Sequence, residues 1–165
     1  MAYDFAATLA SEQALGSYLV KRVILSPALW AAYSNTTPLT WTSVKFDAAN
    51  AGTVPDTTGV YSFVVNPGIC QHPGTHDLLY LGRARGVTLR RRFRDYLREK
   101  SADKGRPPVQ AMLNRWSDHL WFYYAPVPNP AVIDALEVDL LTAYLPPVNQ
   151  NFPAEILTIL KGVFL

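Results

Sequence analysis

The sequence predicts an α+β fold in which a small three-stranded antiparallel sheet is flanked by helices and preceded by a helical N-terminal extension. Short runs of β-forming residues alternate with amphipathic runs of helical period, and proline or glycine clusters separate them. The chain has 165 residues, 49% of them hydrophobic and 17% charged, which excludes a disordered chain and a coiled coil. We expect residues 1–58 to form the extension and residues 59–165 the main domain.

The extension is expected to contain helices and one short strand. Apolar residues recur near helical spacing from residue 4 to about residue 25, and the Ser26-Pro27 step ends that pattern. Residues 39–46 alternate enough to predict a short strand. The small and polar stretch 47–58 then predicts a connector.

The main domain is expected to begin with a hairpin followed by two helices. Residues 60–65 are rich in β-formers, and residues 78–81, closed by Gly82, predict the partner strand. Thr88 is an N-cap for an amphipathic helix that extends to Lys100. A proline-containing break separates it from a shorter helix predicted over 109–116.

A third strand and two more helices complete the predicted domain. The strand is predicted over 120–127, and Asn129-Pro130 then marks a helix start. This helix is expected to end near Leu145, before Pro146-Pro147, and a last helix is predicted over 152–165.

Positive charge is concentrated in one segment. Ten basic and three acidic residues lie between Arg83 and Arg106, whereas the rest of the chain holds five basic and ten acidic residues. Such a basic face would attract a phosphate polyanion, because neutralised phosphates release condensed counterions. If the charge of this segment is considered alone, the alternative interpretation is a helix face that is simply exposed to solvent.

The cellular setting is predicted from absences in the sequence. No run approaches eighteen apolar residues, so no membrane span is expected, and the first residues lack the basic start of a secretory signal. The single cysteine, Cys70, cannot form an internal disulfide. A reducing, cytoplasmic location is therefore expected.

Four short motifs follow one another in the main domain. They are Gly59-Val60-Tyr61 at the first strand, Tyr80-Leu81-Gly82-Arg83 at the second, Arg92 and Tyr96 on the basic helix, and Leu136-Glu137 followed twelve residues later by Asn149. In this order they resemble the GIY-YIG nuclease family, which includes UvrC-type repair nucleases, homing endonucleases and restriction enzymes. The resemblance covers residues 59–149, a little over half of the chain. It implies a GIY-YIG-like domain that cleaves phosphodiesters.

Phosphodiester hydrolysis needs a metal site, a positive group for the developing charge and a group that orients or deprotonates water. Glu137 supplies an oxygen ligand suited to one divalent cation, Mg²⁺ or Mn²⁺, with water and substrate phosphate completing the shell. Asp134 and Asp139 are the neighbouring carboxylates. The Leu136-Glu137 match and the spacing to Asn149 favour Glu137 as the ligand.

Arg92 is expected to clamp the scissile phosphate with its planar fork. Tyr96 lies four residues further along the helix, so the two side chains point the same way. The choice of Arg92 over Arg90 or Arg91 depends on using Leu89 and Tyr96 as the frame of the alignment.

The resemblance further implies that Tyr61 and Tyr80 project into the site and that one of them acts on the attacking water. A phenol has an ordinary pKa of about 10, so we expect Arg83, Arg92 and the metal to favour the phenolate. A metal-bound hydroxide is the rival base, and the choice between the two tyrosines stays open. Arg83 stands where the family often has a cation, and Asn149 where hydrogen bonding is expected to support the site.

Five further arginines are expected to contact the DNA backbone, because phosphate contacts position a duplex without reading its sequence. They are Arg85, Arg90, Arg91, Arg94 and Arg98. The expected function is a metal-dependent endonuclease that hydrolyses DNA phosphodiester bonds, of the restriction or phage and mobile-element defence kind. The alternative is a non-catalytic nucleic-acid-binding module on the same fold. The chain is expected to act as a homodimer or as an accessory subunit, and no membrane partner is expected.

Overall fold

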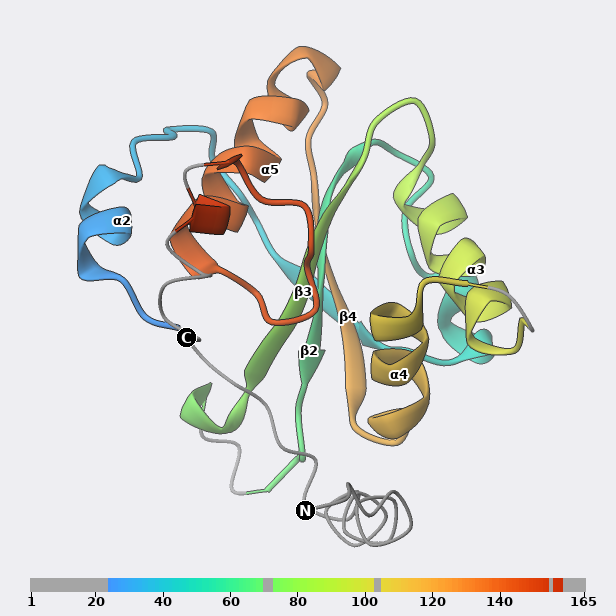
Figure 1. Ribbon diagram of the computed structural model, residues 1–165. Helices are drawn as coiled ribbons and strands as arrows, with labels where there is room; N and C mark the ends of the chain where they lie inside the picture. The colour runs from blue at the N-terminus through green and yellow to red at the C-terminus, as the bar shows by residue number, and fades with distance from the viewer. Residues whose placement is uncertain (1–23, 70–72, 103–104, 155, 159–165) are drawn as a thin grey trace, which may run out of the picture.

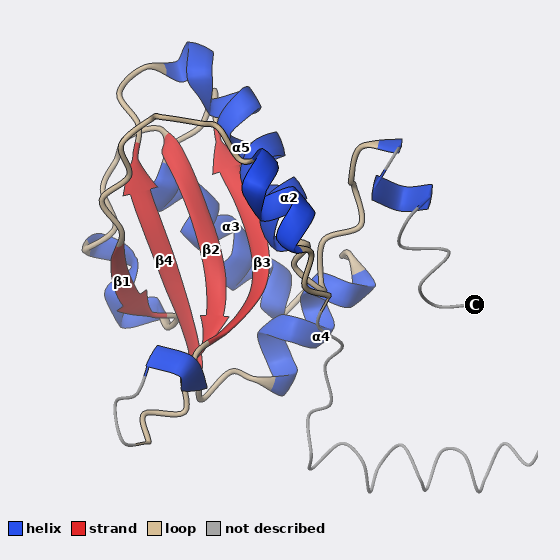
Figure 2. Ribbon diagram, turned by 90° about the vertical axis from the view of Figure 1, so that its left-hand side faces the viewer, coloured by secondary structure: helices blue, strands red, loops and turns tan. Residues whose placement is uncertain are grey.

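The computed structural model describes residues 24–69, 73–102, 105–154 and 156–158. Within these residues it contains one antiparallel sheet of four strands in the order β1-β4-β2-β3, with helices on both faces (Figures 1 and 2). The strands are β1 (Thr42–Lys45), β2 (Gly59–Val65), β3 (Asp77–Ala84) and β4 (Leu120–Pro126). The predicted α+β class is confirmed.

The sheet has four strands where three were predicted for the main domain. The additional strand is β1, which comes from residues assigned to the extension and pairs with β4, with Thr42 opposite Tyr124 and Lys45 opposite Trp121. Alternation at 39–46 predicted a strand here but not its partner. The partner could not be predicted because strand pairing depends on contacts between segments that are distant in sequence. In the folded chain β1 covers the outer edge of β4.

Strand β2 is the most buried strand because it lies between β3 and β4 and has helices on both faces. Its side chains alternate between two cores. Tyr61 and Phe63 join an aromatic cluster with Phe93 and Phe122 on the face covered by α3, whereas Val60 belongs to an aliphatic cluster on the face covered by α5.

Two helices begin at the residues that the capping pattern predicts. The Thr88 hydroxyl accepts a hydrogen bond from the Arg91 amide at the start of α3 (Leu89–Lys100), and Asn129 caps α5 (Pro130–Tyr144) by accepting from Ala131. Figure 1 shows α5 and α2 on one side of the sheet, and α3 and α4 (Pro107–Arg115) on the other. Short 3₁₀ turns occupy η1 (Ala48–Gly52) and η2 (Pro73–Thr75).

One helix was missed and two predicted boundaries were wrong. The missed helix is α2 (Pro27–Ala32), which begins at the Ser26-Pro27 step because Ser26 accepts from the Leu29 amide and proline suits the first helical turn. Helix α4 begins at its two prolines, earlier than predicted, because proline suits its first turn as well. Strand β3 does not close at Gly82 but continues to Ala84, which pairs with Gly59.

Parts of two predicted helices lie outside the described residues. These are the helical pattern before residue 24 and the end of the last helix, of which residues 154 and 156–158 are helical. Among the residues that the structure describes, no helix has both the length and the apolar character needed to cross a bilayer.

Candidate active site

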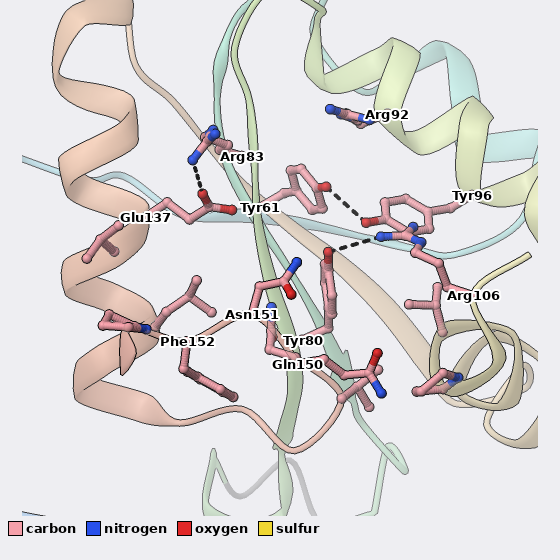
Figure 3. Close-up of a pocket in the computed structure, with 17 residues that line it drawn as sticks. Tyr61, Tyr80, Arg83, Arg92, Tyr96, Arg106, Glu137, Gln150, Asn151 and Phe152 are labelled. Carbon is pink, nitrogen blue, oxygen red and sulfur yellow. Dashed lines mark hydrogen bonds and ion pairs between the residues drawn. The ribbon is translucent and has the colours of Figure 1, made fainter. Parts of the chain in front are cut away.

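A cleft of about 560 Å³ lies beside β3, which is an edge strand of the sheet. Helix α5 forms one wall, α3 and the start of α4 form the other, and the segment after α5 crosses below (Figure 3). Seven residues singled out in the sequence line it: Tyr61, Tyr80, Arg83, Arg92, Tyr96, Glu137 and Asn149. The fold therefore gathers in one cleft side chains that are up to 88 positions apart in the chain.

Three tyrosines from three elements pack together at the centre of the cleft. The Tyr61 and Tyr96 hydroxyl oxygens lie 3.0 Å apart in a hydrogen bond, and the Tyr80 ring lies 6.5 Å from that of Tyr61 and 6.1 Å from that of Tyr96. Burial raises the pKa of Tyr61 well above its usual range, and it does the same for Tyr96. Both phenols are therefore neutral at physiological pH.

The expectation that neighbouring arginines favour a phenolate was wrong for Tyr61. Arg92 does lower the pKa of Tyr61, but this effect is smaller than that of burial, because Tyr61 is only 3% exposed. Tyr80 differs in being half-buried, and its hydroxyl lies 3.4 Å from Nη1 of Arg106. Of the two motif tyrosines, Tyr80 is the one that water can reach more easily.

The glycines of the two tyrosine motifs lie where no side chain would fit. Gly82 is paired with Tyr61, and a Cβ atom at Gly82 would lie 2.6 Å from the Tyr61 hydroxyl oxygen. A Cβ at Gly59 would lie 2.3 Å from the carbonyl oxygen of Ala125. Gly82 thus lets the Tyr61 ring lie across β3, and Gly59 lets β2 approach β4 closely.

Ion pairs connect β3 to α5 on the opposite wall. The Arg83 guanidinium binds Glu137 through Nη1 and Asp134 through Nε, the latter at 3.0 Å, and Arg85 also pairs with Asp134. Asp139 lies elsewhere and accepts a hydrogen bond of 3.0 Å from Asn35. Among the three carboxylates of α5, only Glu137 lines the cleft.

The donor set suits a hard cation at one carboxylate. The Glu137 side chain is 17% exposed and uses one oxygen on Arg83, so its other oxygen is available to a cation. The described residues contain no group of three or more His, Cys, Asp or Glu side chains that could hold a metal ion. A metal at Glu137 would therefore take its remaining ligands from water and substrate.

Arg92 lines the cleft and has a hydrogen-bond donor that no other described residue uses. Its Nε atom is buried and has no hydrogen-bond partner among the described residues. A buried cationic donor without a partner is costly, and an anionic ligand would satisfy it. Arg90, by contrast, donates from Nε to the Val54 carbonyl at 2.7 Å, and Arg91 pairs with Asp95. Of Arg90, Arg91 and Arg92, only Arg92 lines the cleft.

The arginines expected to contact DNA lie outside the cleft. Arg91 and Arg98 share Asp95 as an ion-pair partner on the exposed side of α3. Arg94 is exposed on the same helix, whereas Arg90 is held against the loop after η1 by Val54. Intramolecular carboxylates and carbonyls thus engage several of these cations, including Arg85 at Asp134.

Asn149 reaches the site through the turn that ends α5. Leu145 adopts a left-handed conformation with φ of 47°, and the chain then returns to β3, where the Val148 amide donates to the Leu79 carbonyl at 3.0 Å. The Asn149 side chain accepts from the Leu81 amide at 2.9 Å and donates to the Leu81 carbonyl at 2.8 Å. This segment acts as a short edge partner for β3 and fixes the backbone next to Tyr80.

Sequence reasoning missed Arg106, Gln150 and Asn151, which also line the cleft. Arg106 was counted in the basic segment expected to attract phosphates, but it was not singled out as a site residue. The one feature of the sequence that could have indicated Arg106 is its position directly before Pro107-Pro108. Proline favours the first turn of a helix, so Arg106 becomes the N-cap of α4 and has an extended backbone.

Comparison of the chain with models of protein families, with curated proteins and with solved structures finds no match. The arguments about function therefore depend on the cleft itself. It combines an arginine and a solvent-accessible phenol, which suit an anionic substrate, with a carboxylate that can hold a cation beside that substrate.

Proposed function

We propose that this protein is a metal-dependent endonuclease that hydrolyses DNA phosphodiester bonds in the cleft beside β3, on a GIY-YIG-like domain. The observation that carries the proposal is the convergence of Glu137, Tyr80 and Arg92 on one cleft, where the buried Nε atom of Arg92 has no hydrogen-bond partner among the described residues. A phosphodiester offers an anionic oxygen to the arginine, a phosphorus atom to an oriented water and an oxygen ligand to a cation beside the carboxylate.

Arg92 binds the phosphate in this mechanism. Its guanidinium lines the cleft, and its Nε has no hydrogen-bond partner among the described residues, so a phosphate that binds there displaces no partner of that atom. The attacking water loses one proton to solvent as its oxygen bonds to phosphorus, and the bond to the leaving oxygen breaks, so charge develops on the phosphate oxygens. The Arg92 guanidinium, carried by α3, stabilises that charge.

The tyrosines orient water rather than carry a permanent negative charge. Tyr61 and Tyr96 stay neutral because both are buried, and the hydrogen bond between them fixes their hydroxyls. Tyr80 is the accessible phenol, and its hydroxyl can accept a hydrogen bond from the attacking water. Asn149 holds the β3 backbone beside Tyr80 and thereby fixes the direction of this side chain.

Glu137 would hold Mg²⁺ or Mn²⁺, which supplies Lewis-acid stabilisation of phosphate charge when it is bound. The ion pair with Arg83 holds the Glu137 side chain in place on the α5 wall.

Cleavage of supercoiled plasmid and of single-stranded DNA, with Mg²⁺, Mn²⁺ or EDTA, tests the proposal. We expect metal-dependent cutting that Glu137→Gln abolishes. Asp139→Asn is the matched control, because it removes the same charge from the same helix at a side chain that faces Asn35 and not the cleft. We expect this control to cut as the unaltered chain does.

Two outcomes would contradict the proposal. Cutting that is equally strong in Glu137→Gln or in EDTA would place the reaction elsewhere. DNA binding without cutting under any metal condition would favour the alternative, a non-catalytic nucleic-acid-binding module. Thermal unfolding of both variants checks that they are folded.

A further inference from the structure

Arg106 is held rigidly between α3 and α4 by one carboxylate from the last turns of α3. The Arg106 backbone amide and Nε both donate to Oε1 of Glu99, at 3.1 and 3.0 Å, and Nη2 donates to Oε2 at 2.7 Å. These hydrogen bonds keep the pKa of Glu99 below its usual range. The guanidinium is therefore fixed in direction before any ligand arrives.

The free edge of this guanidinium faces the cleft. Nη1 lies 3.4 Å from the Tyr80 hydroxyl, and the guanidinium carbon lies 5.3 Å from the centre of the Tyr96 ring (Figure 3). A guanidinium has five N–H donors. Glu99 takes two of them and Tyr80 one, on a side chain that is 53% exposed and therefore open to a ligand.

We propose that Arg106 binds a backbone phosphate of the nucleic acid strand in the cleft and that Glu99 is its positioning residue. Arg92 and Arg106 lie on the same wall of the cleft, with Tyr96 between them (Figure 3). Two guanidiniums separated by an aromatic ring suit two phosphates of one chain better than a single small anion. The inference rests on the proposed function, because it assumes a nucleic acid strand in this cleft.

The test is the salt dependence of DNA binding in EDTA, where no cutting is expected to interfere. Each phosphate contact contributes about 0.9 to the slope of log K against log salt concentration for duplex DNA, and about 0.7 for a single strand. The binding constants of labelled single-stranded and duplex oligonucleotides of mixed sequence are measured at a series of salt concentrations. Arg106→Gln is expected to reduce the magnitude of this slope by about 0.7 to 0.9.

Matched variants separate a phosphate contact from a structural role. Arg115→Gln is the control, because Arg115 is an exposed arginine on α4 that does not line the cleft, and we expect it to leave the slope unchanged. Glu99→Gln keeps the cation but loosens it, so we expect an unchanged slope with affinity about 3- to 10-fold weaker. If Arg106→Gln does not fold, Glu99→Gln combined with Arg106→Gln removes both charges of the pair and tests the same slope.

An unchanged slope in folded Arg106→Gln, an equal reduction in Arg115→Gln, or no DNA binding by the unaltered chain would overturn the inference. The two proposals fail separately. A chain that binds DNA with the slope dependent on Arg106 but never cuts refutes the endonuclease alone. A chain that cuts DNA while Arg106→Gln leaves the slope unchanged refutes only the role of Arg106.

Discussion

Substitution of Gly82 by alanine should force the Tyr61 ring out of its position. A Cβ atom there would lie 2.6 Å from the Tyr61 hydroxyl oxygen and 2.7 Å from its Cζ atom, well inside van der Waals contact. The ring cannot retreat freely, because it stacks on Phe122 at 5.2 Å and meets Tyr96 edge-on at 5.8 Å. The substitution therefore overpacks the core beneath the cleft.

The expected loss of stability follows from two effects. Overpacking a core costs about 1–3 kcal/mol. Breaking the hydrogen bond between Tyr61 and Tyr96 removes about 1 kcal/mol more. We expect Gly82→Ala to lower the free energy of unfolding by roughly 2–4 kcal/mol, which for a chain of this length lowers Tm by roughly 5–15 °C.

Chemical and thermal unfolding of Gly82→Ala beside Gly52→Ala measures this effect. Gly52 is the matched control, because a Cβ there meets nothing within 4 Å, and we expect its substitution to change stability by less than about 1 kcal/mol. Removal of the large ring by Tyr61→Leu should make Gly82→Ala less costly in a double-mutant cycle. Equal stability of the two glycine variants would refute the argument.

Three other predictions concern stability and protonation. Asn149→Ala should remove the side chain that bonds the Leu81 amide and carbonyl, and should lower the free energy of unfolding by about 2–4 kcal/mol. Hydrogen exchange at the Leu81 amide should become faster, and unchanged exchange would contradict this. Burial raises the pKa of Tyr61, so the unfolded chain loses this proton first as pH rises, and the free energy of unfolding falls above about pH 10. Urea titrations should show a smaller fall of that free energy in Tyr61→Phe than in the unaltered chain. Arg106 lowers the pKa of Glu99, so the pair stabilises the fold at neutral pH, and this stabilisation is lost as pH falls below about 4. Between neutral and acid pH, Tm should therefore vary less in Glu99→Gln than in the unaltered chain, and identical acid profiles would refute the coupling.

Local patterns in the sequence determined the order of the elements and the starts of two helices. Thr88 and Asn129 identify helix starts because a capping side chain bonds backbone amides two or three residues away. Residues 60–65 predicted β2 because β-branched and aromatic residues suit a pleated sheet. Such effects act over a few residues, so they can be predicted before the chain folds.

The positions of the motifs also predicted which side chains share a cleft. The roles assigned to them, including a metal ligand at Glu137 and a phosphate clamp at Arg92, stay predictions until cleavage and binding are measured. The sequence could not predict that Arg90 is already engaged, because the Val54 carbonyl that accepts from it lies 36 residues earlier, whereas the pair of Arg91 with Asp95 is a local i,i+4 contact on α3. Only the folded structure leaves the Nε atom of Arg92 buried without a partner among the described residues.

Tertiary structure alone decided the strength of the electrostatic effects in the cleft and the pairing of β1. The pKa of Tyr61 rises instead of falling because desolvation by surrounding side chains outweighs the nearby cations. Arg106 enters the cleft because Glu99, seven residues earlier, holds it there. Strand β1 joins the sheet by pairing with β4, almost eighty residues away. Burial and long-range contacts are properties of the packed chain, and no local pattern of residues encodes them.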